Sequence, residues 1–321
     1  MTSERPPVAV VGAGSIGVAW AILFARAGHR VSVHDVDGMR LMAVAGEVRD
    51  RLQELGEHGL VADPAPIAAR IRTTASLADA IGFAVHVQEC VVESEEVKRD
   101  LFAALDALAR PGTVLASSSS MMPVSRFAAA LPGRDRCLVV HPGNPPYLLP
   151  VAELVPAEFT SESTVTRTQD LLTAAGMLPV LVRREVEGFV FNRLQGALLR
   201  EAYRLVRDGV ASAADIDTVV THGLGRRWGV IGPFATAELN TRGGIERHAG
   251  LMGPAYLRMG AEVGEQETWS PELVAEVAAS VHETLPPEDW AENVLRRDQA
   301  LMRIVAAGPE LREQESGPGA H

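Results

Sequence analysis

Three glycines near the start of the chain, Gly12, Gly14 and Gly17, form the sequence feature that most constrains the fold. They follow a β-branched run at residues 8–11 and precede an apolar helical pattern over residues 18–27. In this spacing the first glycine permits a tight turn, the second lets a pyrophosphate approach the backbone, and the third lets the helix pack on the strand. We therefore expect a strand, turn and helix that bind a dinucleotide.

The next β-like run places a carboxylate beside this turn. Asp35 ends residues 31–35, where it can accept hydrogen bonds from both ribose hydroxyls. The same carboxylate would repel the extra phosphate of NADP, so the expected cofactor is NAD. Ser15 and Ile16 begin the helix whose amides would face the phosphates. A glycine turn with a purely structural purpose is the weaker alternative.

Strand-like and helical stretches alternate over about the first 180 residues. Further β-like runs lie at residues 84–87, 113–116 and 137–140, and a helical pattern covers residues 94–108. Such alternation predicts a doubly wound parallel sheet. From Phe189 onward the pattern is helical.

We therefore expect an α/β protein with an N-terminal Rossmann-type doubly wound sheet and an all-helical C-terminal domain. The boundary is placed near Arg184, after the last β-like run. The expected domains are residues 1–184 for the cofactor and residues 185–313 for the helices. Residues 314–321, rich in Gly, Pro and Ser around charges, are expected to be a disordered tail.

Composition narrows the class of partner and the compartment. The 41 acidic and 30 basic side chains leave a net charge of -11, which disfavours nucleic acid and anionic membranes. Two cysteines, Cys90 and Cys137, are too few for a disulfide framework or a cysteine zinc site, and no metal is expected. Both lie in apolar strand patterns and are interpreted as buried structural thiols. No membrane-spanning stretch or signal peptide is recognised, which favours the cytoplasm.

A histidine and a glutamate flank a proline-rich loop. His141 follows a β-like run, so it would lie at the carboxyl edge of the sheet, where a rigidly held histidine suits proton transfer. Glu153 lies in an apolar strand pattern, where an unpaired carboxylate would be costly. If the chain turns back after the loop, Glu153 can accept a hydrogen bond from His141. A structural histidine and a water-facing glutamate are the alternatives.

These residues resemble the 3-hydroxyacyl-CoA dehydrogenase family. The resemblance rests on Ser120 after a strand, His-x-x-Asn-Pro at residues 141–145, Glu153, and Gly-Phe-x-x-Asn-Arg-Leu at residues 188–194. It implies that His141 is the catalytic base and that Glu153 orients it. It also implies that Ser120 and Asn192 hydrogen-bond the substrate oxygen.

The same resemblance implies further contacts and an assembly. Family positions that contact the cofactor match Glu93, Lys98, Ser120 and Asn144. The helical domain matches the part through which family members form a homodimer.

Arg227 indicates the class of substrate. The acyl-CoA enzymes of the family lack an arginine at this position, whereas the relatives that act on free acids have one. A guanidinium can bind a free carboxylate through two hydrogen bonds, but a thioester offers no such anion. Within the family, the chain is most similar to the enzymes that oxidise L-gulonate. The expected reaction is thus NAD-dependent oxidation of the 3-hydroxyl of a free 3-hydroxy acid, L-gulonate to 3-dehydro-L-gulonate.

Several alternatives remain open at this stage. A short-chain 3-hydroxyacyl-CoA and L-carnitine are the alternative substrates, and an NAD-binding structural or sensing protein is the non-enzymatic alternative. Arg226 and Arg227 could also be solvated charges at a helix end. Gly143 and Ser119 replace larger residues of the family, which predicts a roomier pocket.

Overall fold

The computed structural model describes residues 5–57, 60–261, 271–282, 285–290, 292–293 and 296. The chain divides into two compact units, Met1–Leu199 and Arg200–His321, and each is described by itself. The division falls inside a helix, α8 (Phe191–Arg207), rather than at the sequence boundary near Arg184. The tail expected at residues 314–321 lies outside the described residues.

The first unit is built on one eight-stranded sheet in the order β3-β2-β1-β4-β5-β6-β7-β8. Neighbouring strands are parallel except for the β6–β7 pair, which is antiparallel. This is the predicted doubly wound sheet, extended at one edge by two strands, β7 and β8, that run in the opposite direction. The strands are β1 (Arg5–Val11), β2 (His29–His34), β3 (Ile71–Thr74), β4 (His86–Glu89), β5 (Val114–Ser117), β6 (Cys137–Pro142), β7 (Val151–Pro156) and β8 (Leu178–Leu181).

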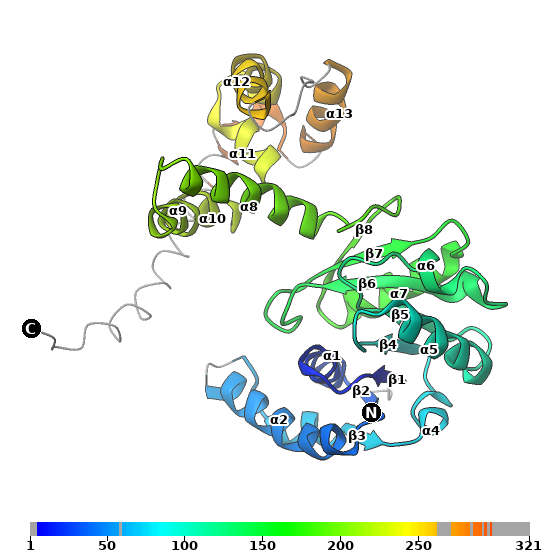
Figure 1. The fold of residues 1–321 in the computed structure, drawn as a ribbon. Coiled ribbons are helices and arrows are strands. Elements are labelled where there is room, and N and C mark those ends of the chain that lie inside the picture. The colour runs from blue at the N-terminus through cyan, green and yellow to red at the C-terminus, as the bar shows by residue number, and fades with distance from the viewer. Residues whose placement is uncertain are drawn as a thin grey trace, which may run out of the picture. The chain divides into compact units, whose positions relative to one another are not determined.

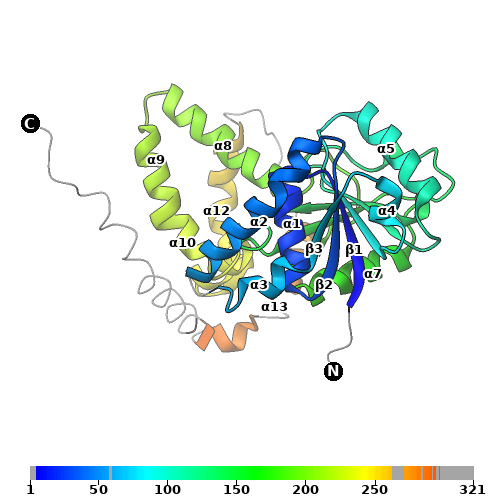
Figure 2. The ribbon, with the colours of Figure 1, turned by 90° about the horizontal axis from the view of Figure 1, so that it is seen from below.

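Helices cover both faces of this sheet, as parallel crossovers require. One core contains buried side chains of α1 (Ser15–Arg26), α2 (Gly38–Glu57), α3 (Pro64–Ala68) and α7 (Glu162–Ala174). The other contains side chains of α4 (Leu77–Ile81), α5 (Glu95–Leu108) and α6 (Ser125–Ala128). Figure 2 shows the sheet edge-on, between α1–α3 and α4–α5. Because the strands from β1 to β6 run parallel, their carboxyl ends meet at one edge.

The fourth strand differs in position from the sequence expectation. A strand is expected at residues 84–87, but β4 begins at His86 and continues through Gln88 and Glu89. Both polar side chains are fully buried there. An apolar pattern cannot predict this, since their burial depends on partners: Gln88 Nε2 donates to Ser118 Oγ at 2.7 Å, and Lys98 Nζ donates to Glu89 Oε1 at 2.8 Å.

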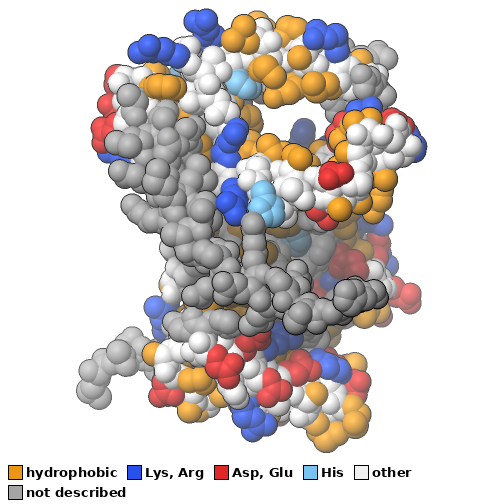
Figure 3. Space-filling view, turned by 90° about the vertical axis from the view of Figure 1, so that its left-hand side faces the viewer, with side chains coloured by type: hydrophobic (Ala, Val, Ile, Leu, Met, Phe, Trp, Pro, Cys, Tyr) orange, Lys and Arg blue, Asp and Glu red, His pale blue; other side chains and the backbone are white. Residues whose placement is uncertain are grey.

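The second unit is helical throughout its described residues, as expected. Beyond α8 it contains α9 (Ala213–Val219), a π-helical turn (Val220–Leu224), α10 (Gly225–Trp228), α11 (Pro233–Asn240), α12 (Gly244–Ala261), α13 (Pro271–His282) and a 3-10 turn (Pro287–Asp289) (Figure 1). Hydrophobic side chains (orange) lie exposed on these helices in Figure 3. Among the described residues, no helix has both the length and the apolar character needed to cross a membrane.

Candidate active site

The glycine turn connects β1 to α1 at the carboxyl edge of the sheet. A Cβ on Gly12 (φ +105°) would lie 2.5 Å from the Cys90 carbonyl oxygen, and one on Gly17 would lie 1.9 Å from the Gly12 oxygen. These two glycines are therefore required by the fold itself. Around Gly14, in contrast, no atom from elsewhere in the protein lies within 4 Å of the Cβ position. Its open backbone is the surface that a pyrophosphate needs to approach.

Asp35 lies directly against this turn. Its Oδ2 accepts a hydrogen bond from the Ala13 amide at 2.6 Å, and its Oδ1 accepts one from the Asp37 amide at 2.9 Å. Gly14 precedes α1 without any side-chain cap. The uncapped helix start, the open face of Gly14 and the carboxylate at the end of β2 together fit an NAD molecule.

Two cofactor positions expected from the family, the buried Lys98 and the exposed Glu93, meet in one charge network. Lys98, only 1% exposed, donates to Glu89 and lies 3.4 Å from Glu93 Oε2. Burial opposes the ionisation of Glu93, but a hydrogen bond from Ser119 and the charge of Lys98 outweigh it and hold the pKa of Glu93 below its ordinary value. Lys98 thus holds Glu93 in place, and a direct contact of Lys98 with the cofactor stays a prediction.

The predicted pairing of His141 with Glu153 is confirmed. The two residues are register partners across the antiparallel β6–β7 pair, and His141 Nδ1 lies 2.7 Å from Glu153 Oε2. Glu153 Oε1 accepts from the amides of Val190 at 2.7 Å and Phe191 at 2.9 Å. Burial disfavours the Glu153 carboxylate, but these hydrogen bonds prevail, so its pKa lies below the ordinary range. The carboxylate can therefore stabilise a protonated His141.

Aromatic rings confine the imidazole of His141. The rings of Phe189 and Phe191 have centroids 5.8 Å and 6.0 Å from that of His141. Phe189 has φ +51°, a left-handed conformation that side chains other than glycine seldom adopt. The turn before α8 thus has a strained backbone at Phe189. This turn places two backbone amides and two aromatic rings beside the His141–Glu153 pair.

Ser120 and Asn192 are also brought together. Asn192 Nδ2 donates to the Ser120 carbonyl oxygen at 2.8 Å, which links the loop after β5 to the start of α8. Asn144 lies exposed in the loop after β6. Arg227 lies half-buried in α10 of the second unit, so the structure does not place it relative to His141. Within the described residues no ion pair of Arg227 is found.

The expectation that Gly143 enlarges the pocket is wrong for this structure. A Cβ on Gly143 would lie 2.8 Å from the Leu149 Cβ and 3.0 Å from the Leu149 oxygen. The space beside this glycine is filled by its own loop, which folds back onto it. Ser119 is likewise buried, and its hydroxyl is bonded to Glu93 and accepts from the Met122 amide.

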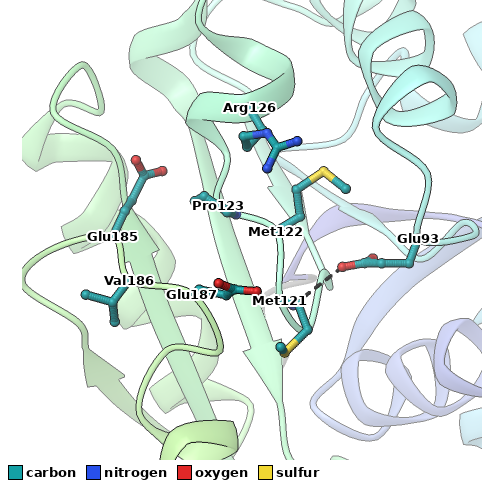
Figure 4. Close-up of a pocket in the computed structure, with 8 residues that line it drawn as sticks. All are labelled: Glu93, Met121, Met122, Pro123, Arg126, Glu185, Val186 and Glu187. Carbon is teal, nitrogen blue, oxygen red and sulfur yellow. Dashed lines mark hydrogen bonds between the residues drawn. The ribbon is translucent and has the colours of Figure 1, made fainter.

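A cavity of about 340 Å³ opens beside the loop that follows β5 and contains Ser120 and Met121. Arg126 provides its one basic group among the described lining residues, and this guanidinium is already paired with Glu95. The cavity therefore offers no unpaired cation for a substrate carboxylate. It is lined by Glu93, Met121, Met122, Pro123, Arg126, Glu185, Val186 and Glu187 (Figure 4).

Sequence reasoning missed the buried partners of the site. Glu89 accepts from Lys98 and also from Ser117 Oγ at 2.6 Å. The hydroxyls of residues 117–120 are expected from the sequence to face the cofactor or substrate, whereas no role is expected for Glu89. The signal was available in part, since Glu89 ends an apolar run where an unpaired carboxylate would be costly. The amides of Val190 and Phe191 carry no sequence signal, because any residue supplies a backbone amide.

The two cysteine thiols are not candidate nucleophiles. Both cysteines are free and buried, as expected. Burial is the main cause that raises the thiol pKa of Cys90 far above its ordinary value and that of Cys137 to about 12. Neither is a nucleophile at neutral pH.

Fold and site together are those of a nicotinamide-dependent dehydrogenase, in which the protein positions the cofactor and a general base serves the hydroxyl group. Comparison with known families makes the assignment more specific. The NAD-binding domain of 3-hydroxyacyl-CoA dehydrogenase matches residues 7–186, and the C-terminal domain of that enzyme matches residues 188–281. The chain belongs to the 3-hydroxyacyl-CoA dehydrogenase family, and it is an NAD-dependent dehydrogenase that acts on a CH–OH group.

Individual relatives differ in name but cover the chain almost completely. A lambda-crystallin homologue of Bos taurus is 39% identical, over 95% of this chain and 96% of its own. The L-carnitine dehydrogenase of Streptomyces coelicolor is 34% identical, over 96% of each chain. The crystal structure of an NAD-dependent 5-formyl-3-hydroxy-2-methylpyridine 4-carboxylic acid 5-dehydrogenase has a TM-score of 0.73 and 28% identity, over 95% of this chain and 99% of its own.

Proposed function

We propose that the protein oxidises the 3-hydroxyl of a free 3-hydroxy carboxylic acid, most like L-gulonate. The observation that carries the catalytic half of this proposal is the 2.7 Å contact between His141 Nδ1 and Glu153. With Nδ1 committed to the carboxylate, Nε2 is the nitrogen that remains to take a proton. NAD, when bound at the glycine turn, would supply the hydride acceptor that this oxidation needs.

Each further residue has a role that its position supports. Nε2 of His141 removes the hydroxyl proton, and Glu153 stabilises the imidazolium that results. Ser120 and Asn192, joined by their hydrogen bond, orient the substrate oxygen. Asp35 and the helix start at Ser15 and Ile16 hold the cofactor. These groups and Glu93 carry no net positive charge, so a substrate carboxylate needs a cation from elsewhere.

Arg227 is the proposed source of that cation. It is half-buried and free of ion pairs among the residues described, and a guanidinium can bind a carboxylate through two hydrogen bonds. Two relatives of the chain support a free acid. One acts on L-carnitine, and the other on a pyridine carboxylic acid.

The substrate class is tested by NADH formation with L-gulonate, 3-hydroxybutyrate, L-carnitine and a short-chain 3-hydroxyacyl-CoA. We expect the highest kcat/KM with L-gulonate. Arg227→Met should raise KM for the free acid by about 10- to 100-fold, as expected for a lost charge-assisted hydrogen bond, and leave KM for the thioester unchanged. Arg226→Met is the matched control, because it removes the neighbouring guanidinium.

Other outcomes would select the alternatives. Preference for the thioester, with equal effects of Arg227→Met on both substrates, would identify an acyl-CoA enzyme. Preference for L-carnitine would identify a carnitine dehydrogenase. Tight NAD binding with no turnover across the panel would favour a structural or sensing protein.

We also propose that the protein is a cytoplasmic homodimer. The support is the apolar surface of α8, where Leu194 is 63% and Tyr203 74% exposed. Such side chains favour contact with a second apolar surface. Light scattering of the purified protein would show twice the chain mass, and a monomeric mass at micromolar concentration would contradict the proposal.

A further inference from the structure

Three side chains from three helices of the second unit point their polar atoms at one place. Glu238 belongs to α11, Glu246 to α12 and His282 to the end of α13. Their candidate ligand atoms all lie within 4.8 Å of one another. None of the three has a role in the proposed reaction.

The Glu238 carboxylate is buried but only half satisfied. The residue is 1% exposed, and its Oε2 accepts from the Ile245 amide at 2.8 Å and lies 3.1 Å from His282 Nε2. Its Oε1 is buried with no hydrogen-bond partner. An unsatisfied carboxylate oxygen in the interior is costly, and such groups usually have a partner such as water or an ion.

The backbone leaves room for this carboxylate. A Cβ on Gly244 would lie 2.9 Å from Oε2 and 3.0 Å from Oε1 of Glu238, so only glycine fits at the start of α12. On the other side Glu246 is exposed, so the group of three side chains borders solvent. Ligands about 2.0–2.2 Å from an ion stand at most about 4.4 Å apart. The 4.8 Å limit on the distances among the three ligand atoms exceeds this span only slightly, so a small side-chain adjustment would close the group around one ion.

We propose that Glu238, Glu246 and His282 bind one divalent transition-metal ion, with Zn²⁺ as the test ion. Two carboxylates and a neutral imidazole carry a charge that balances a dication, and this mixture of oxygen and nitrogen ligands suits Zn²⁺. Solvent completes the coordination on the side of Glu246. The ion connects α11, α12 and α13, so its role is structural. The sequence predicts no metal, because ligands 8 and 36 residues apart match no short motif.

A competing explanation uses the same carboxylate without a metal. Glu238 accepts from the Ile245 amide, and Glu246 lies in the first turn of α12, where negative charge is favourable. In that case Glu238 only caps the helix, and a water molecule satisfies Oε1. The two explanations differ in what Glu246 and His282 contribute to metal affinity.

The test uses the full-length protein, without a histidine tag and freed of metal with EDTA. Titration with ZnCl₂ by calorimetry should show one site per chain, and Zn²⁺ should raise the unfolding temperature. Co²⁺ should give a visible ligand-field absorption that Zn²⁺ abolishes. Glu246→Gln and His282→Gln should each weaken Zn²⁺ binding by at least about 10-fold. Glu272→Gln, an exposed glutamate in the first turn of α13, should leave it unchanged.

Glu238→Gln is not used, because loss of the cap could itself unfold α12. The exposed Glu246 carries no such risk, and circular dichroism checks the fold of each variant. The proposal is overturned if no saturable binding occurs up to about 1 mM Zn²⁺. It is equally overturned if Glu246→Gln and His282→Gln bind Zn²⁺ as tightly as the wild type.

Discussion

His141 and Glu153 face each other across two antiparallel strands, with Nδ1 and Oε2 2.7 Å apart and both side chains buried. The second carboxylate oxygen is held by two backbone amides at the start of α8. The carboxylate is therefore fixed in place, and with it the plane of the imidazole. This relationship gives the histidine a defined tautomer, which a general base requires.

The first prediction concerns the base itself. His141→Ala should lower kcat by about 10²- to 10⁴-fold, the usual contribution of a general base, because no other group takes the hydroxyl proton. Affinity for NAD should be unchanged, since the glycine turn and Asp35 are untouched. Steady-state kinetics and an NAD titration would measure the two effects. Near-normal turnover would refute the assignment.

The second prediction separates orientation from charge. In Glu153→Gln one amide oxygen can still accept from Val190 and Phe191, but the amide nitrogen then faces His141. It would donate to Nδ1 and leave the proton on Nε2, which is the wrong tautomer for a base. We expect kcat to fall by about 10²- to 10⁴-fold, as loss of the orienting acid does in comparable sites. Glu162→Gln, an exposed first-turn glutamate of α7, is the control. Unchanged kcat in Glu153→Gln would contradict this role.

The third prediction distinguishes two glycines of one turn. Gly14→Ala meets no protein atom, so the fold should keep its unfolding temperature while the affinity for NAD falls at least about 10-fold. Gly12→Ala should instead destabilise the protein by several kcal/mol, because its Cβ would collide with the Cys90 oxygen and φ is +105°. Thermal unfolding and NAD titration of both variants measure this. Equal NAD affinity in wild type and Gly14→Ala would refute the phosphate contact.

The fourth prediction concerns acid stability. Burial lowers the pKa of His86 from 6.5 to about 4. Between these two pH values the imidazole is therefore protonated in the unfolded chain but neutral in the folded chain. The corresponding stability is present above pH 6.5 and is lost as the pH falls toward 4. The shift corresponds to about 3 kcal/mol. Urea unfolding at pH 7 and pH 4.5 should show a smaller loss in His86→Gln than in the wild type. Identical pH dependence in the two proteins would exclude His86 as a cause.

Much of the nucleotide-binding half could be predicted from local pattern. The spacing of Gly12, Gly14 and Gly17 specifies a turn because only glycine tolerates those backbone contacts, and Asp35 follows at the end of the next strand. The pairing of His141 with Glu153 was also predictable, since a buried carboxylate demands a partner and the proline-rich loop allows the chain to reverse. These inferences work because each depends on one residue and its immediate surroundings.

The tertiary structure decided which segments that are distant in the sequence come into contact. Lys98 is a buried partner of Glu89 and Glu93 rather than an exposed basic group, and Leu149 closes the space beside Gly143. The meeting of Glu238, Glu246 and His282 likewise arises only when three helices pack. The sequence by itself thus determined the fold class, the cofactor and the pairing of His141 with Glu153, because glycine geometry and buried charge act locally. Packing decided which charges are neutralised, since that depends on side chains that only the folded chain brings together.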